Sequence, residues 1–246
     1  MKRQLLFRQI YYDARLVQAR RTQFFIDSKE QHESVTKIHE DSLVKWLFSN
    51  DRFPMLLCQE LHIDLENMLF FVGVKDPITT NGKKPGDIDI LIVDKLAPCK
   101  SIAIECKVVK SESIGQGKAK VNKISKIRRG IIQANKYQGL GFYQSYFMVI
   151  ISEDGRHEET KNIMMRSPQE KETEVIYDIP QNERMHEDLG VIYVSISQPT
   201  GRSFNLTGGI GVCIDKNANK LEQTIGLTNK IKDVCKSGVY KSFNFR

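Results

Sequence analysis

The sequence predicts an α/β fold in which a central mixed β-sheet of about five strands is flanked by helices. Short apolar runs of strand length alternate with segments in which apolar residues recur every three or four positions, as on one face of a helix. Clusters of glycine, proline and asparagine separate these segments and are typical of turns. The predicted strands are residues 68–74, 88–93, 101–109, 142–151 and 191–196.

A helix is predicted before the first of these strands, over residues 35–47, with Ser34 as its N-cap. Glu40, Leu43 and Leu47 are three and four residues apart, so they share one face of this helix. The helix is expected to end near Asn50, before Pro54. Of the strands that follow, the second and third are expected to form an antiparallel hairpin.

Two further helices are predicted in the second half of the chain, over residues 118–138 and 221–235. The glycine-rich stretch Gly208-Gly209-Ile210-Gly211 lacks the Gly-Lys-Ser/Thr ending of a phosphate loop, so it is not interpreted as one. The chain is expected to comprise an N-terminal arm over residues 1–33, a core over 34–198 with a polar insertion near 153–190, and a C-terminal extension over 199–246.

The composition is typical of a globular protein that has no membrane partner. Apolar residues make up 40% of the chain and charged residues 27%, and no apolar run approaches the roughly 20 residues that cross a bilayer. Charged residues interrupt the N-terminal apolar stretch, so no secretory signal is predicted and a cytoplasmic location is expected. The five cysteines show no CxxC spacing, so no zinc site is predicted. Cys58, Cys106 and Cys213 lie in apolar surroundings and are expected to be reduced core thiols.

The net charge of +7 favours a polyanionic partner such as DNA. Six basic residues gather in a segment that contains no acidic residue. Lysines and arginines that neutralise phosphates add salt-sensitive affinity, so we expect this segment to contact nucleic acid. A solvated basic face is the alternative interpretation. The residues are Lys118, Lys120, Lys123, Lys126, Arg128 and Arg129.

Charged residues also interrupt two of the apolar strands. Asp87 and Asp89 stand at the start of one strand, and Glu105 and Lys107 lie inside the next. Because side chains alternate along a strand, Asp87 and Asp89 are expected to point the same way, and Glu105 and Lys107 to share a face opposite Cys106. Charged side chains inside an apolar strand are costly unless they are paired or bind a metal.

This combination fits phosphodiester hydrolysis. Magnesium takes carboxylate, water and phosphate oxygens as ligands, polarises the phosphoryl group and lowers the pKa of a bound water. A neighbouring lysine orients that water and stabilises the negative charge that develops on the phosphate. A surface hairpin with a salt bridge is the alternative. The second Glu-x-Lys match, at Glu159, lies in a polar segment with no acid-bearing strand before it.

Over roughly residues 35–151 the chain resembles the PD-(D/E)xK nuclease superfamily, which includes restriction endonucleases, Holliday-junction resolvases and RecB-type nucleases. The resemblance implies a restriction-endonuclease-like core in which Asp89 and Glu105 bind Mg²⁺, with Mn²⁺ as a substitute. It implies that the backbone carbonyl of Cys106 completes the metal site and that Lys107 assists the attacking water.

The resemblance is imperfect at one motif, because the family's Pro-Asp dipeptide is split here as Pro85-Gly86-Asp87. Asp87 and Asp89 therefore compete for the role of metal ligand, and Asp89 is favoured because it leads directly into the core strand. Members often carry a glutamate on the first helix, for which Glu40 is the candidate and a further metal ligand. A solvated helix-surface acid is the alternative for Glu40.

RecB-like members of the superfamily also carry a Gln-x-x-x-Tyr motif on the helix after the lysine strand, and Gln133 and Tyr137 match it. Residues four apart share a helix face, so this face is expected to touch substrate or to brace the site. The resemblance implies a catalytic role for Gln133 and a nucleic-acid contact for Tyr137. A helix packed by an ordinary tyrosine is the alternative.

The function expected from these patterns is metal-dependent hydrolysis of DNA by a restriction- or repair-type nuclease. Two alternatives stay open: a nucleic-acid-binding module without catalytic activity on the same fold, and a nuclease that acts on RNA. Cleavage of both DNA strands would favour a homodimer, because a two-fold axis places one site on each strand.

Overall fold

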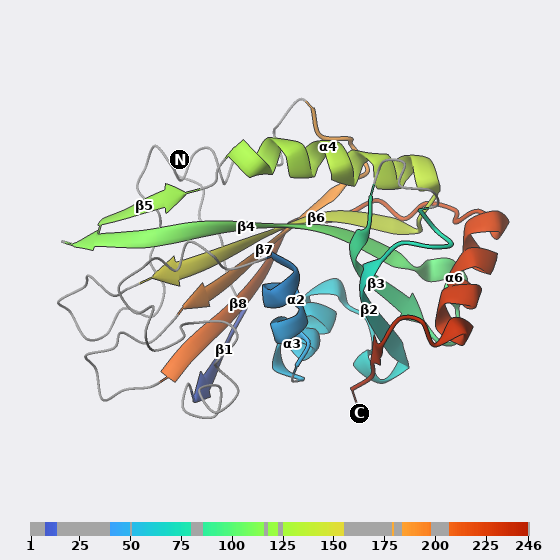
Figure 1. The fold of residues 1–246 in the computed structure, drawn as a ribbon, viewed down its shortest axis with the longest axis horizontal. Helices are drawn as coiled ribbons and strands as arrows, with labels where there is room; N and C mark the ends of the chain where they lie inside the picture. The colour runs from blue at the N-terminus through green and yellow to red at the C-terminus, as the bar shows by residue number, and fades with distance from the viewer. Residues whose placement is uncertain are drawn as a thin grey trace.

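The structure of the chain is a computed structural model, and it describes residues 8–13, 40–49, 51–79, 86–115, 118–122, 125–154, 179, 184–197 and 207–245. Within these residues a single mixed sheet runs through the molecule and helices cover both of its faces (Figure 1). The predicted α/β class, with a mixed sheet between helices, is therefore confirmed.

The sheet has more strands than the five expected. Seven strands follow the order β1-β8-β7-β6-β4-β3-β2, the two-residue strand β9 extends the edge at β2, and β5 pairs with β4 alone, which makes nine described strands. Strands β4, β6 and β7 are parallel and the other pairs are antiparallel. Their bounds are β1 Arg8–Asp13, β2 Met68–Val74, β3 Ile88–Asp94, β4 Ile102–Gly115, β5 Lys118–Asn122, β6 Gln144–Asp154, β7 Gly190–Ser197, β8 Thr207–Lys216 and β9 Ser242–Phe243.

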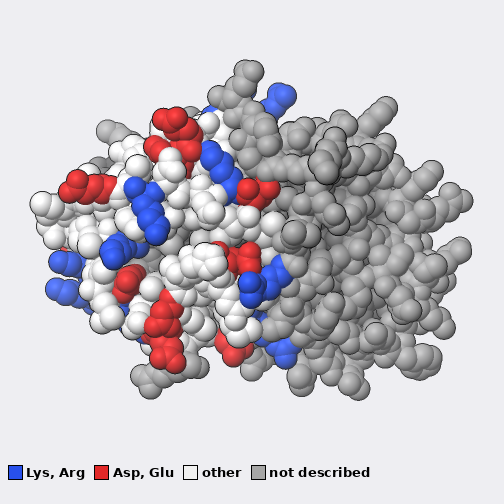
Figure 2. Space-filling model, turned by 180° about the vertical axis from the view of Figure 1, so that it is seen from behind, with Lys and Arg blue, Asp and Glu red and all other residues white. Residues whose placement is uncertain are grey.

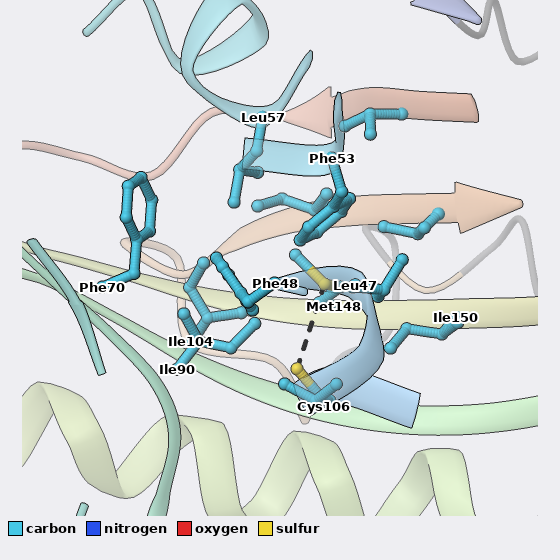
Figure 3. Packing of buried hydrophobic residues seen from close by; sticks show 14 of the residues in the cluster. Leu47, Phe48, Phe53, Leu57, Phe70, Ile90, Ile104, Cys106, Met148 and Ile150 are labelled. Atoms are coloured by element: carbon cyan, nitrogen blue, oxygen red, sulfur yellow. Dashed lines mark hydrogen bonds between the residues drawn. The ribbon is translucent and has the colours of Figure 1, made fainter. Parts of the chain in front are cut away.

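Two layers of helices enclose the sheet. On one face, α2 and α3 pack over apolar side chains of β3, β4 and β6 (Figure 3). On the opposite face, α4 and α6 cover the other set of alternating side chains. The helices are α2 Glu40–Leu47, α3 Arg52–Leu61, α4 Ser125–Leu140 and α6 Ile225–Ser237.

Alternation along β4 places its charged residues under α4. Ile104 and Cys106 belong to the core beneath α2 and α3, whereas Ala103 belongs to the core beneath α4. Glu105 and Lys107 alternate along the strand with Ile104 and Cys106, so they lie on the face of the sheet that α4 covers. The predicted division of β4 into two faces is confirmed.

The helix predicted over residues 118–138 is wrong in its first part. Residues 118–122 form β5, which pairs with the outer half of β4, and α4 begins at Ser125. Backbone hydrogen bonding to a neighbouring strand overrides the local helical spacing here, because strand formation depends on tertiary context.

Helix α3 and strand β8 were not predicted from the sequence. Helix α3 contains Pro54, which the sequence indicated as a position beyond a helix end. Proline in the first turn of a helix is tolerated, because the N–H that it lacks has no partner there. Strand β8 contains the glycine-rich stretch, in which Ile210 and Val212 alternate into the core beneath α3.

The predicted arm and C-terminal extension both contribute to this sheet, since β1 pairs with β8 and β9 pairs with β2. Most of the polar insertion predicted near residues 153–190 lies outside the described residues. Across the described segments, the structure contains no helix with both the length and the apolar character needed to cross a bilayer.

Candidate functional site

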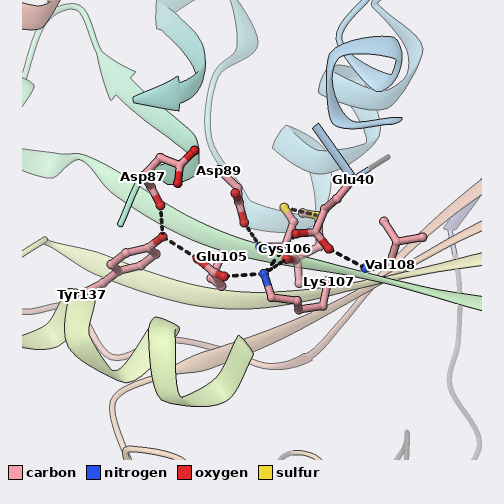
Figure 4. Close-up of polar contacts among 9 residues, drawn as sticks. Glu40, Asp87, Asp89, Glu105, Cys106, Lys107, Val108 and Tyr137 are labelled. Atoms are coloured by element: carbon pink, nitrogen blue, oxygen red, sulfur yellow. Dashed lines mark hydrogen bonds and ion pairs between the residues drawn. The ribbon is translucent and has the colours of Figure 1, made fainter. Parts of the chain in front are cut away.

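The candidate site lies where β3 and β4 stop pairing. β3 pairs with the first part of β4, up to Ile104, and β5 pairs with its last part, from Lys110 onward. β6 occupies the opposite edge of β4 along the whole stretch. The N–H groups of Cys106 and Val108 lie in the gap between β3 and β5, and each donates to a side-chain carboxylate (Figure 4).

Two different elements supply these carboxylates. Asp89 on β3 accepts the Cys106 N–H at 2.6 Å, and Glu40 at the start of α2 accepts the Val108 N–H at 3.1 Å. The pairing of β2 with β3 skips Asp89, whose opposite position is Gly73. Gly73 has a φ of 68°, a left-handed conformation that glycine adopts without strain. The irregular ladder thus coincides with the position at which Asp89 turns toward β4.

Lys107 lies at the centre of the cluster. Its Nζ donates to Glu105 Oε1 at 2.6 Å, to the Cys106 carbonyl oxygen at 2.7 Å and to Glu40 Oε1 at 3.1 Å. An ammonium group has three N–H donors, so these three acceptors satisfy it completely. Lys107 and Glu105 are buried, with only 8% and 1% of their surfaces exposed.

Tyr137 on α4 braces the other oxygen of Glu105. Its hydroxyl lies 2.6 Å from Glu105 Oε2 and 2.9 Å from the backbone carbonyl oxygen of Asp87. The side chain is completely buried, so the prediction that Tyr137 contacts nucleic acid is wrong. The sequence left open a second role, in which Tyr137 braces the site, and the observed contacts agree with that role.

The site concentrates negative charge in a buried place. Burial, and next the charge of Glu105, raise the pKa of Asp89 to about 8. Burial also raises the pKa of Glu105, although the positive charge of Lys107 opposes the shift. Burial alone would lower the pKa of Lys107, but Glu105, Glu40 and Asp89 outweigh it and raise that pKa above its ordinary value. A cation bound near these acids would favour their ionised forms, so the cluster can accept further positive charge.

The donor set of the cluster fits a hard divalent cation. Asp89, Glu105, Glu40 and the Cys106 carbonyl provide oxygen atoms only, which are the ligands that Mg²⁺ prefers. In the part of the chain that the structure describes, no three His, Cys, Asp or Glu side chains are already arranged to hold a metal ion. Glu105, Cys106 and Glu40 instead direct their oxygens at Lys107.

The structure places Asp87 and Gln133 near the turn before β3. β3 begins at Ile88, so Asp87 lies before the strand, and the alternation on which its expected direction depends does not extend to it. The contact that Asp87 makes is through its carbonyl oxygen, while its carboxylate points away from Lys107 (Figure 4). Gln133 is on α4 near the turn before β3, with its Nε2 4.0 Å from the place of a Cβ on Gly86.

The basic segment is divided between two elements. Lys126, Arg128 and Arg129 are exposed on α4, Lys118 and Lys120 belong to β5, and Lys123 lies outside the described residues. On the face shown in Figure 2, lysine and arginine side chains are interspersed with acidic ones over the described surface. A nucleic-acid contact by this segment stays a prediction.

Gly130 was missed by the sequence interpretation. A Cβ at this position of α4 would lie 2.4 Å from the Phe147 ring and 2.5 Å from Lys107 Cγ. The absence of a side chain therefore lets α4 pack directly onto the stem of Lys107. A lone glycine inside a helical pattern is unfavourable for the helix and is the signal that indicates a close approach.

Comparison of the chain with protein-family models, with curated proteins and with solved structures finds no match. The functional interpretation therefore depends on the chemistry of the site.

Proposed function

We propose that this protein is a Mg²⁺-dependent nuclease that hydrolyses DNA phosphodiester bonds with a PD-(D/E)xK-type site. The observation that carries the proposal is the gathering of Asp89, Glu105, Glu40 and Lys107 at the opened edge of β4. Glu105 and Lys107 are buried and Asp89 and Glu40 are partly buried, and burial of charged groups opposes folding unless they are paired or serve a reaction. A nucleolytic site accounts for every one of them.

In this proposal Asp89, Glu105 and the Cys106 carbonyl hold the ion, with Glu40 as a further oxygen donor. A bound divalent ion would polarise the phosphoryl group and lower the pKa of a water molecule. The chain provides the rest of the chemistry. Tyr137 fixes the orientation of Glu105 through its hydroxyl, as partners of ligating carboxylates do in metal sites.

Lys107 is proposed to stabilise negative charge on the phosphate oxygens and to orient the attacking water. Lys126, Arg128 and Arg129 line the exposed side of α4, the helix that covers Lys107. In this proposal these positive side chains contact the phosphates of a strand that enters the site. DNA rather than RNA is proposed as the substrate, and the test below separates the two.

The test is cleavage of circular, linear, branched and single-stranded DNA, and of RNA, by the full chain with Mg²⁺ or with EDTA. Glu105→Gln and Lys107→Ala are compared with Glu222→Gln and Lys230→Ala, which make the same chemical changes at exposed positions. We expect Mg²⁺-dependent cleavage that falls about 100-fold or more in the two site variants and persists in the two controls.

Other results would revise the proposal in defined ways. Cleavage of circular DNA would identify an endonuclease, and degradation of RNA alone would replace the proposed substrate. Nucleic-acid binding without cleavage, retained in both site variants, would overturn the enzymatic proposal in favour of a binding module.

A further inference from the structure

The ammonium group of Lys107 occupies a complete oxygen cage. Glu105 Oε1, the Cys106 carbonyl oxygen and Glu40 Oε1 lie 2.6, 2.7 and 3.1 Å from Nζ, and they come from two elements, β4 and α2. One charged oxygen comes from each glutamate and the neutral oxygen from the backbone. A single positive group thus already holds together oxygens that are distant in sequence.

We propose that Lys107 acts as an internal cation, which occupies the ion-binding oxygens in the metal-free protein and competes with a divalent ion for them. This inference rests on the proposed function and adds a second role for Lys107 to it. Two positive charges cannot share these oxygens without strong repulsion in a buried place. Binding of the divalent ion therefore requires the ammonium group to leave its present position.

The stem of Lys107 determines how the ammonium group can leave. Its Cγ lies in the space that a Cβ of Gly130 would fill, 2.5 Å from that position, so α4 covers the inner part of the side chain. Beyond Cγ the lysine side chain has further rotatable bonds that can carry Nζ elsewhere. Movement of the outer carbons would release Glu105 and the Cys106 carbonyl while the backbone of β4 stays in place.

Removal of Lys107 should change the affinity for the divalent ion differently if Lys107 competes for the ligand oxygens than if it only orients water. If Lys107 occupies the ligand oxygens, its removal makes them available and strengthens binding of the divalent ion. If Lys107 lies outside the ligand set, its replacement removes only the repulsion between two nearby positive charges, and the gain in affinity is smaller. The Lys107→Met variant, which keeps most of the apolar stem, separates the two cases together with the chemical labelling of Lys107 in the native chain.

The experiment measures binding of Mg²⁺ and of Mn²⁺, without nucleic acid, to the native full chain, to Lys107→Met and to the control Lys230→Met by isothermal titration calorimetry. We expect Lys107→Met to bind the ion about tenfold more tightly, within the range by which neighbouring groups change metal affinity. Lys230→Met, which removes an exposed charge on α6, is expected to match the native chain.

A second measurement needs no variant. Lys107 in the native chain is treated with an amine-reactive reagent, and its labelling relative to Lys230 is followed by mass spectrometry as Mn²⁺ is added. Displacement of the ammonium group by the ion should increase labelling of Lys107 and leave labelling of Lys230 unchanged. Labelling of Lys107 that does not rise while the ion binds would overturn the inference.

The outcomes distinguish this inference from the proposed function. Unchanged or weaker ion binding in Lys107→Met, together with Mg²⁺-dependent cleavage by the native chain, would overturn the competition alone. Absence of divalent-ion binding in both proteins would overturn the competition and the metal-dependent nuclease together.

Discussion

At the scale of single residues, Tyr137 shows how the site controls a buried carboxylate. Its hydroxyl has one proton, yet it lies within hydrogen-bonding distance of both Glu105 Oε2 and the Asp87 carbonyl oxygen. A protonated Glu105 satisfies this arrangement by donating to Tyr137, which then donates to Asp87. An ionised Glu105 instead accepts the hydrogen bond that the Tyr137 hydroxyl donates, and the Asp87 carbonyl oxygen then receives none from Tyr137. Tyr137 therefore links the charge of Glu105 to the turn before β3.

Tyr137→Phe removes this hydroxyl and keeps the buried ring. We expect Mg²⁺ affinity, measured by calorimetry, to fall about 10–100-fold, as it does when partners of metal ligands are removed. Tyr240→Phe is the matched control, because the Tyr240 hydroxyl also forms a hydrogen bond, with the Lys75 N–H at 3.1 Å, in a different contact. Equal affinities in the two variants would contradict the role of Tyr137.

Asp89 makes stability depend on pH. Its pKa in the folded protein is raised to about 8, compared with about 4 for an unperturbed aspartate. Between these values the folded state keeps a proton that the unfolded chain has released, so the free energy of unfolding falls as the pH rises. The raised pKa of Glu105 acts in the same direction.

The Asp89→Asn variant separates the contribution of this residue. In urea denaturation without divalent ions, from about pH 5 to about pH 8, the native chain should lose more stability than the variant does. A native chain whose stability changed no more with pH than that of Asp89→Asn would show that Asp89 is ionised throughout this range.

At the scale of elements, the contact of α4 with β4 and β6 depends on a glycine. Gly130 is buried on the inner side of α4, where the Phe147 ring and the Lys107 stem occupy the space of a side chain. Gly139 lies on the exposed side of the same helix, and a Cβ there would meet nothing within 4 Å. The two glycines thus make a matched pair in one helix.

We expect Gly130→Ala to lower the free energy of unfolding by about 1–3 kcal/mol, the usual effect of overpacking a core. Gly139→Ala should raise it by up to about 1 kcal/mol, because alanine favours the helix. Urea denaturation measures both changes. If Gly130→Ala were as stable as Gly139→Ala, the close approach of α4 to Lys107 would not exist in solution.

At the scale of the whole molecule, the described part of the face in Figure 2 shows no single basic patch, although the chain has a net charge of +7. Acidic and basic side chains are interspersed on the described part of the face in Figure 2. The position of a cation relative to the site, rather than total charge, should then decide whether it contacts a bound phosphate. The exposed cations of α4 and of α6 provide two sets of equal charge for comparison.

Replacement of Lys126, Arg128 and Arg129 by glutamine should weaken DNA binding and make it less dependent on salt. Each lost phosphate contact lowers the slope of log K against log salt by about 0.9. The control replaces Lys230, Lys232 and Lys236 on α6, with the same change in net charge. Fluorescence anisotropy at several salt concentrations measures both slopes. Equal slopes in the two triple variants would exclude α4 as the phosphate-contacting element.

Most of the confirmed predictions depend on patterns among residues that are close together in the sequence. The strands β2, β3, β4, β6 and β7 follow from apolar runs of strand length, and the helix face with Leu43 and Leu47 follows from helical spacing. The shared face of Glu105 and Lys107 follows from alternation along one strand, which needs no knowledge of neighbours.

Predictions that failed depend on which segments meet. Residues 118–122 form a strand because the outer half of β4 offers them a partner. Tyr137 is buried because α4 lies over β4, so its hydroxyl reaches Glu105 instead of solvent. Pairing and burial of this kind join residues far apart in the chain, and local propensity does not specify them.

The sequence by itself determined the α/β class, the two faces of β4 and the identity of Asp89, Glu105 and Lys107 as the charged residues of the central strands. Only the tertiary structure decided that the pairing of β3 with β4 ends at Ile104 and that Glu40 and Asp89 bond the N–H groups in the gap. It also decided that the Lys107 stem packs against Gly130. The physical reason is that alternation is a property of one strand, whereas a gap between strands and a close helix contact arise only when several elements pack together.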